Sequence, residues 1–69
     1  MRLDDNEIFI LTLLDTHHGI GLNLFLKVLR KKGVISAESS LTNLEAKGYV
    51  GTEQALDLIY LTPKGTKVI

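Results

Sequence analysis

The spacing of apolar and polar residues predicts a first helix near the start of the chain. Residues 8–15 contain no glycine or proline and are apolar on almost every face. Asp4 or Asp5 is placed to cap this helix, and Glu7 follows Asp4 at the spacing of a capping box. A helix with so little polar surface is expected to be buried on more than one side, by its own domain or by a partner. The glycine-containing segment 17–21 ends it.

Two further helices are expected in the middle of the chain. Residues 22–32 place apolar side chains at positions i, i+3, i+4 and i+7, and Gly33 follows a run of bases that suits the negative end of a helix. After a short turn, Ser36 is expected to be the N-cap of a third helix, which Gly48 ends in a left-handed conformation.

A β-hairpin is predicted after the third helix. One strand begins at residues 49–50, and alternation of apolar and polar side chains predicts the other over residues 56–61, with residues 51–55 as the loop. Thr62 is expected to cap a final helical turn that begins with proline. Ile20 is expected to form a short strand beside the hairpin. The fold class is therefore α+β.

Length and composition bound what such a chain can do. With 69 residues it is expected to be one domain, residues 1–69, with a thin core and little surface on which to enclose an active site. The sequence contains no cysteine, which excludes disulfides, thiolate metal sites and cysteine nucleophiles. The formal net charge is zero, which is unusual for a dedicated nucleic-acid-binding protein.

Two motifs give the chain a resemblance to a known family. The run LEAKGYV at residues 44–50 looks like the end of a winged-helix recognition helix, and LTPKG at residues 61–65 resembles the segment after the second wing strand. Together they resemble the winged helix-turn-helix of MarR-type and PadR-type transcriptional regulators. The chain lacks the long dimerisation helices of MarR-type proteins. Its wing carries Glu53 and Asp57 and no arginine or lysine.

The resemblance implies a regulator that binds double-stranded DNA, with residues 37–47 as the recognition helix in the major groove. Asn43 can read adenine, and neighbouring short polar side chains can contact bases or phosphates. The alternative interpretation is that these residues form an ordinary solvated helix face, which has a similar composition. The candidate contacts on and beside this helix are Ser36, Ser39, Ser40, Thr42, Asn43 and Lys47.

The positive charge is concentrated in one part of the sequence. Residues 16–36 carry four bases and no acid, a net charge of +4, whereas residues 1–15 carry −3 and residues 37–69 carry −1. This cluster can lie along a phosphate backbone, or it can serve only to neutralise the helix dipole. The bases are Lys27, Arg30, Lys31 and Lys32.

An alternative function is a winged-helix module that binds protein and not DNA. The first two helices have more apolar residues than one thin core needs, and an exposed patch of them would mark an interface, such as that of a homodimer. The hairpin and the final turn can instead cover them. The candidate interface residues are Ile10, Leu13, Leu14, Leu24 and Val28.

Other classes of function find little support in the sequence. Adjacent His17 and His18 point about 100° apart on a helix end and chelate a metal poorly. No nucleophile or glycine-rich cofactor motif is recognisable, so neither enzyme activity nor a cofactor is expected. Acids near the N-terminus predict no export signal, and no apolar stretch is long enough for a membrane span. The expected location is the cytoplasm.

Overall fold

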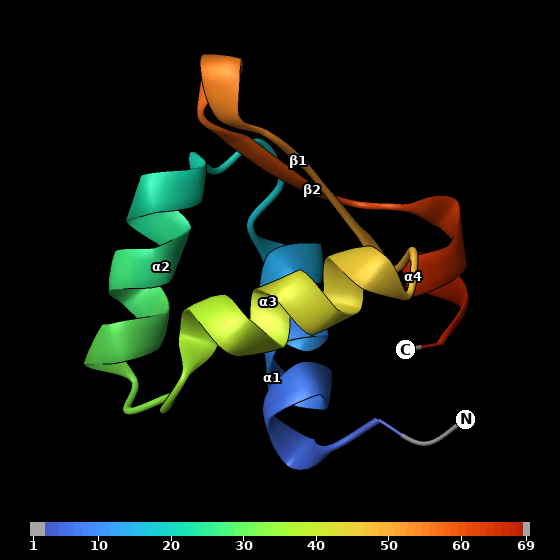
Figure 1. Cartoon of the computed structure of the whole chain (residues 1–69), viewed down its shortest axis with the longest axis horizontal. Helices are drawn as coiled ribbons and strands as arrows, with labels where there is room; N and C mark the ends of the chain where they lie inside the picture. The colour runs from blue at the N-terminus through green and yellow to red at the C-terminus, as the bar shows by residue number, and fades with distance from the viewer. Residues whose placement is uncertain (1–2, 69) are drawn as a thin grey trace.

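A computed structural model of the chain describes residues 3–68 and shows three helices, a two-stranded antiparallel hairpin and a short C-terminal helix (Figure 1). This α+β arrangement is that of a winged helix. In chain order the elements are α1 (Asp5–Thr16), α2 (Leu22–Lys31), α3 (Ala37–Ala46), β1 (Val50–Glu53), the 3-10 turn η1 (Gln54–Leu56), β2 (Leu58–Leu61) and α4 (Pro63–Lys67).

The start of α1 is fixed by the predicted capping box. The backbone N–H of Glu7 donates to the Asp4 carboxylate at 2.7 Å, and the backbone N–H of Asp4 donates to the Glu7 carboxylate at 3.1 Å. These bonds satisfy two amide groups that have no partner within the helix. They also turn the side chain of Glu7 inward, where it is 4 % exposed.

The turns around α3 follow the glycines, as the sequence predicted. Gly33 has φ +82° and Gly48 has φ +83°, a region that side chains other than glycine rarely occupy. After Gly48, the N–H of Tyr49 donates to the carbonyl of Leu44 at 3.0 Å, a bond typical of a glycine C-cap. Ser36 does occupy the N-cap position, but it is left-handed with φ 57° and its side chain makes no capping hydrogen bond.

The hairpin differs from the expected one in where its loop lies. Val50 pairs with Leu61, and the ladder extends to Glu53 opposite Leu58, so the predicted loop 51–55 is in part a strand. The chain reverses through η1 and through Asp57, which is left-handed with φ 51°. The expected strand contact of Ile20 is made one residue later, as an isolated bridge between Gly21 and Leu58.

The core lies where α1, α3 and the hairpin meet, with α2 packed at one side (Figure 1). Side chains from all of these elements are almost fully buried, and their removal from water is the main force that holds α3 in place. The largest are Ile10, Leu11, Leu14, Phe25, Leu29, Leu44 and Ile59.

The burial of α1 corrects the predicted partner interface. Ile10 is 0 % and Leu14 2 % exposed, because α1 is covered by both α3 and β2, so these two residues belong to the core and not to a free surface. Leu13 and Val28 are half-buried. Leu24, at 56 % exposed, is the one member of the set that lies largely in solvent.

Candidate nucleic-acid interface

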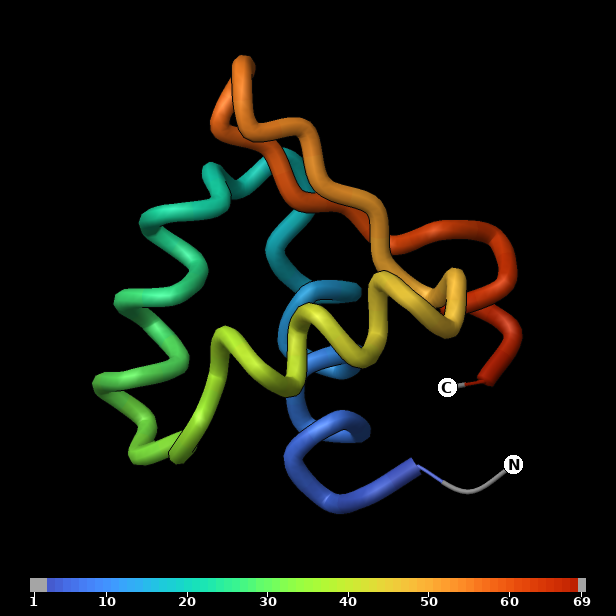
Figure 2. Tube along the Cα trace, in the orientation of Figure 1, coloured from blue at the N-terminus to red at the C-terminus, as the bar shows by residue number. Residues whose placement is uncertain are grey.

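Helix α3 presents one outward face between α2 and the hairpin. Figure 2 shows the chain turning sharply after α2 and then running as α3 across the front of α1. Leu41 and Leu44 hold α3 against the core. The outward side chains are short and mostly polar, apart from two carboxylates. The exposed residues of α3 are Glu38, Ser39, Thr42, Asn43, Glu45 and Ala46, and Ser40 is half-buried.

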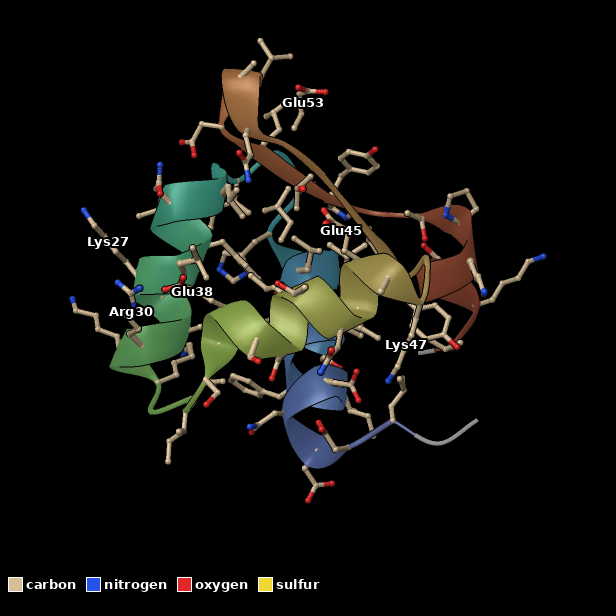
Figure 3. All side chains as sticks on the ribbon, viewed as in Figure 1. Lys27, Arg30, Glu38, Glu45, Lys47 and Glu53 are labelled. Atoms are coloured by element: carbon tan, nitrogen blue, oxygen red, sulfur yellow. The ribbon has the colours of Figure 1, made fainter. Side chains whose placement is uncertain are left out.

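A basic corner forms where α2 ends and α3 begins. Lys27, Arg30 and Lys31 lie in the last two turns of α2 and Lys32 is its C-cap, and all four are exposed. Arg30 donates from Nη2 to Oε1 of Glu38 at 2.6 Å, and both side chains are mostly in solvent, 61 % and 70 % exposed (Figure 3). This pair reduces the charge that Arg30 offers to a phosphate.

Lys47 lies in a different environment from the one the sequence predicted. It was expected to be exposed and available to DNA, but its ammonium donates to Oε2 of Glu7 at 2.7 Å, and the two side chains are 26 % and 5 % exposed. The pair joins the end of α3 to the start of α1. Lys47 is therefore a structural residue here. The capping-box spacing of Glu7 marked that carboxylate, but nothing local in the sequence marked its partner 40 positions away.

The side of α3 that faces the hairpin is acidic. Glu45 accepts a hydrogen bond from the hydroxyl of Thr52 on β1, and Glu53 lies exposed further along the same strand (Figure 3). Glu38 and Glu45 thus form an acidic edge of α3, with the bases of α2 beside Glu38 and the hairpin beside Glu45.

Asp57, an acid of the predicted wing, has a structural role. Its Oδ1 accepts from the backbone N–H and the side-chain amide of Asn23, each at 3.0 Å, and its carbonyl accepts from the N–H of Leu22 at 3.0 Å. The N-cap of α2 is Gly21, which has no side chain to do this. Asp57 thus caps α2 from the hairpin tip and places a negative charge at the positive end of the helix dipole.

Lys64 of α4 caps the C-terminal end of α3. Its ammonium donates to the carbonyl of Lys47 at 3.0 Å and lies 5.3 Å from the centre of the Tyr49 ring. A cation at a helix C-terminus stabilises the dipole. Thr62 caps α4 through its hydroxyl, as predicted, and that hydroxyl also donates to the carbonyl of Gly48 at 2.7 Å.

The two histidines are not part of a metal cluster. His17 Nδ1 lies 2.8 Å from the carbonyl of Leu13, and within residues 3–68 no three His, Cys, Asp or Glu side chains are grouped to hold a metal ion. Among the helices of the same described range, none combines the length and hydrophobicity needed to cross a membrane.

Comparison of the chain with known protein families, curated proteins and solved structures found no match. The winged-helix assignment therefore stands on the order and packing of the elements described above.

Proposed function

We propose that this protein is a DNA-binding transcriptional regulator, in which α3 enters the major groove of double-stranded DNA. The observation that carries the proposal is the helix-turn-helix of α2 and α3, which exposes a row of short polar side chains next to a cluster of cations. Short side chains let a helix approach base edges closely, and cations fix it to the backbone.

The basic corner would contact phosphate. Lys27, Lys31 and Lys32 are exposed and form no ion pair with any of the residues that the structure describes. Arg30 would join them by exchanging Glu38 for a phosphate oxygen. Because the wing tip is acidic and Asp57 is used to cap α2, the hairpin contributes little to DNA binding in this proposal.

Asn43 is the proposed specificity residue. It is exposed on α3 between Ser39 and Ala46, and an asparagine amide can form two hydrogen bonds with the N6 and N7 positions of adenine. The resemblance of LEAKGYV and LTPKG to MarR-type and PadR-type regulators supports the same function, since both segments hold α3 in place in this fold.

The test uses fluorescence anisotropy with random duplexes and with a specific duplex selected from them by its affinity for the unaltered protein. The double variant Lys31→Gln/Lys32→Gln should weaken binding to all sequences alike, whereas Asn43→Ala should remove about 1–3 kcal/mol of discrimination at a single base pair. Lys67→Gln, which changes a lysine at the end of α4, is the matched control. Equal affinities for all four proteins would contradict the proposal.

A protein-binding module is the second candidate, and the acidic edge of α3 favours it. Glu38 and Glu45 would face the phosphates of a DNA duplex, and like charges repel. Replacing both with glutamine distinguishes the two functions: the double variant should bind DNA more tightly, whereas it should bind a basic protein partner more weakly.

A further inference from the structure

A groove with an apolar floor lies between α2, α3 and β1. Its floor is formed by Leu22 and Leu26 of α2 and by Leu41 of α3, and its volume is about 140 Å³. A volume of this size accommodates one long side chain rather than a whole helix or a nucleic-acid base pair. The groove is open to solvent, and its lining includes the carboxylates of α3.

The rim of the groove carries two carboxylates. Glu38 and Glu45 line it about two helical turns apart on α3, together with Thr52 and Gln54 from the hairpin. Glu38 has one cationic partner, the solvent-exposed Arg30, and Glu45 has none among residues 3–68. The groove therefore combines apolar side chains with two carboxylates, of which only Glu45 has no cationic partner among these residues.

We propose that this groove binds a basic, amphipathic segment of a partner protein. The aliphatic stem of an arginine or lysine would lie on the three leucines, and its charged end would reach the carboxylate of Glu45. Charge complementarity selects this occupant, because a phosphate backbone would be repelled by both carboxylates. The inference is independent of DNA binding, but a segment bound here would cover α3 and exclude DNA from it.

The experiment is an NMR titration of the ¹⁵N-labelled protein with two capped tetrapeptides, acetyl-Arg-Leu-Leu-Arg-amide and acetyl-Glu-Leu-Leu-Glu-amide. The basic peptide should shift the amide signals of Leu26, Thr42, Thr52 and Gln54, and the acidic peptide should not. Glu45→Gln should raise the Kd for the basic peptide by about threefold, the effect of one exposed ion pair. Glu53→Gln, which removes the same charge at the end of β1 but does not line the groove, should leave that Kd unchanged.

Three results would overturn the proposal. The first is that the amide shifts are absent or confined to other elements, and the second is that both peptides give equal shifts. The third is that the same shifts appear when the free protein is concentrated, because the groove would then bind a second copy of the chain. A duplex titration with Glu45→Gln separates this inference from the proposed function. If the peptide binds as described and no duplex binds, the groove proposal is confirmed and the proposed function fails.

Discussion

The two ends of α3 carry ion pairs of nearly the same length in very different surroundings. At its start, Arg30 and Glu38 are 2.6 Å apart and mostly in water; at its end, Lys47 and Glu7 are 2.7 Å apart and mostly buried. Water screens the charges of the exposed Arg30–Glu38 pair, whereas the Lys47–Glu7 pair has little contact with water. Because the two distances are nearly equal, burial is what separates the pairs, and we expect the buried pair to contribute more to the stability of the fold.

The backbone around each ion pair differs in the same way: it is enclosed at the end of α3 and open at its start. The end of α3 is enclosed by the start of α1 and by α4, where Gly65 packs directly against the carbonyl of Tyr49. The turn at Gly33 has no atom within 4 Å of the place where a Cβ would lie. The basic corner is therefore the open part of the helix-turn-helix, and this openness suits a region that meets a partner.

The largest expected effect comes from breaking the buried pair. Glu7→Ala removes both an ion-pair partner and half of the capping box, so we expect a loss of about 3 kcal/mol in the free energy of unfolding. Urea denaturation followed by far-ultraviolet circular dichroism measures it. The matched control, Glu38→Ala, should lose about 0.5 kcal/mol or less because its pair is exposed. Equal losses for the two variants would refute the distinction between the two ends.

A second pair of variants compares Gly65 of α4, which packs beyond the end of α3, with Gly33, which lies in the turn before α3. A Cβ on Gly65 would lie 2.1 Å from the carbonyl oxygen of Tyr49, so Gly65→Ala must push α4 away from the end of α3. We expect a cost of about 2–3 kcal/mol. Gly33→Ala meets no atom and should cost about 1 kcal/mol through its left-handed backbone alone. Thermal unfolding gives both values, and a larger loss for Gly33→Ala would contradict the packing described.

The same contrast between an anchored and an open end applies to α2. Asp57→Ala removes the cap that the hairpin supplies to the start of this helix, and the expected cost is about 1–2 kcal/mol. Asp57→Asn keeps an acceptor oxygen and a residue that tolerates the left-handed conformation, so it should cost about 0.5 kcal/mol. The denaturant midpoints of the two variants measure these losses of stability. An Asp57→Ala protein as stable as the parent would show that the hairpin tip does not cap α2.

The smallest effect on stability is expected at the exposed Arg30–Glu38 pair. Breaking this pair should instead change the affinity for DNA. Glu38→Gln should change the free energy of unfolding by less than about 0.5 kcal/mol, yet raise duplex affinity by about threefold because Arg30 is released. Anisotropy at low salt measures the affinity. Asp15→Asn removes the same charge near the end of α1 and should raise the duplex affinity less. A weaker Glu38→Gln complex would mean that the carboxylate contributes to binding.

Local signals in the sequence predicted most of the fold. The capping box at Asp4 and Glu7 and the left-handed Gly48 depend on residues close in sequence, and each lies where it was expected. The pairing of Lys47 with Glu7 and the capping of Asn23 by Asp57 join residues 40 and 34 positions apart, which no local pattern can reveal.

The candidate site could be predicted only in part. The exposed, polar character of Ser39, Thr42 and Asn43 follows from helical periodicity, and these residues do share one face of α3. The apolar excess of α1 indicated an interface, but burial between α3 and β2 accounts for Ile10 and Leu14. Helical periodicity also gave no sign that Glu45 would reach the hairpin, since that contact depends on where β1 packs.

The most direct test of the account is a salt series of anisotropy measurements on the unaltered protein with a generic labelled duplex. The account predicts binding at low ionic strength whose log affinity falls linearly with log salt, with a slope of about −3 if three lysines of the basic corner each displace one counterion. Lys31→Gln/Lys32→Gln should reduce that slope by about 2. Absence of binding at the lowest salt, or an unchanged slope in the double variant, would contradict the assignment of the basic corner to DNA.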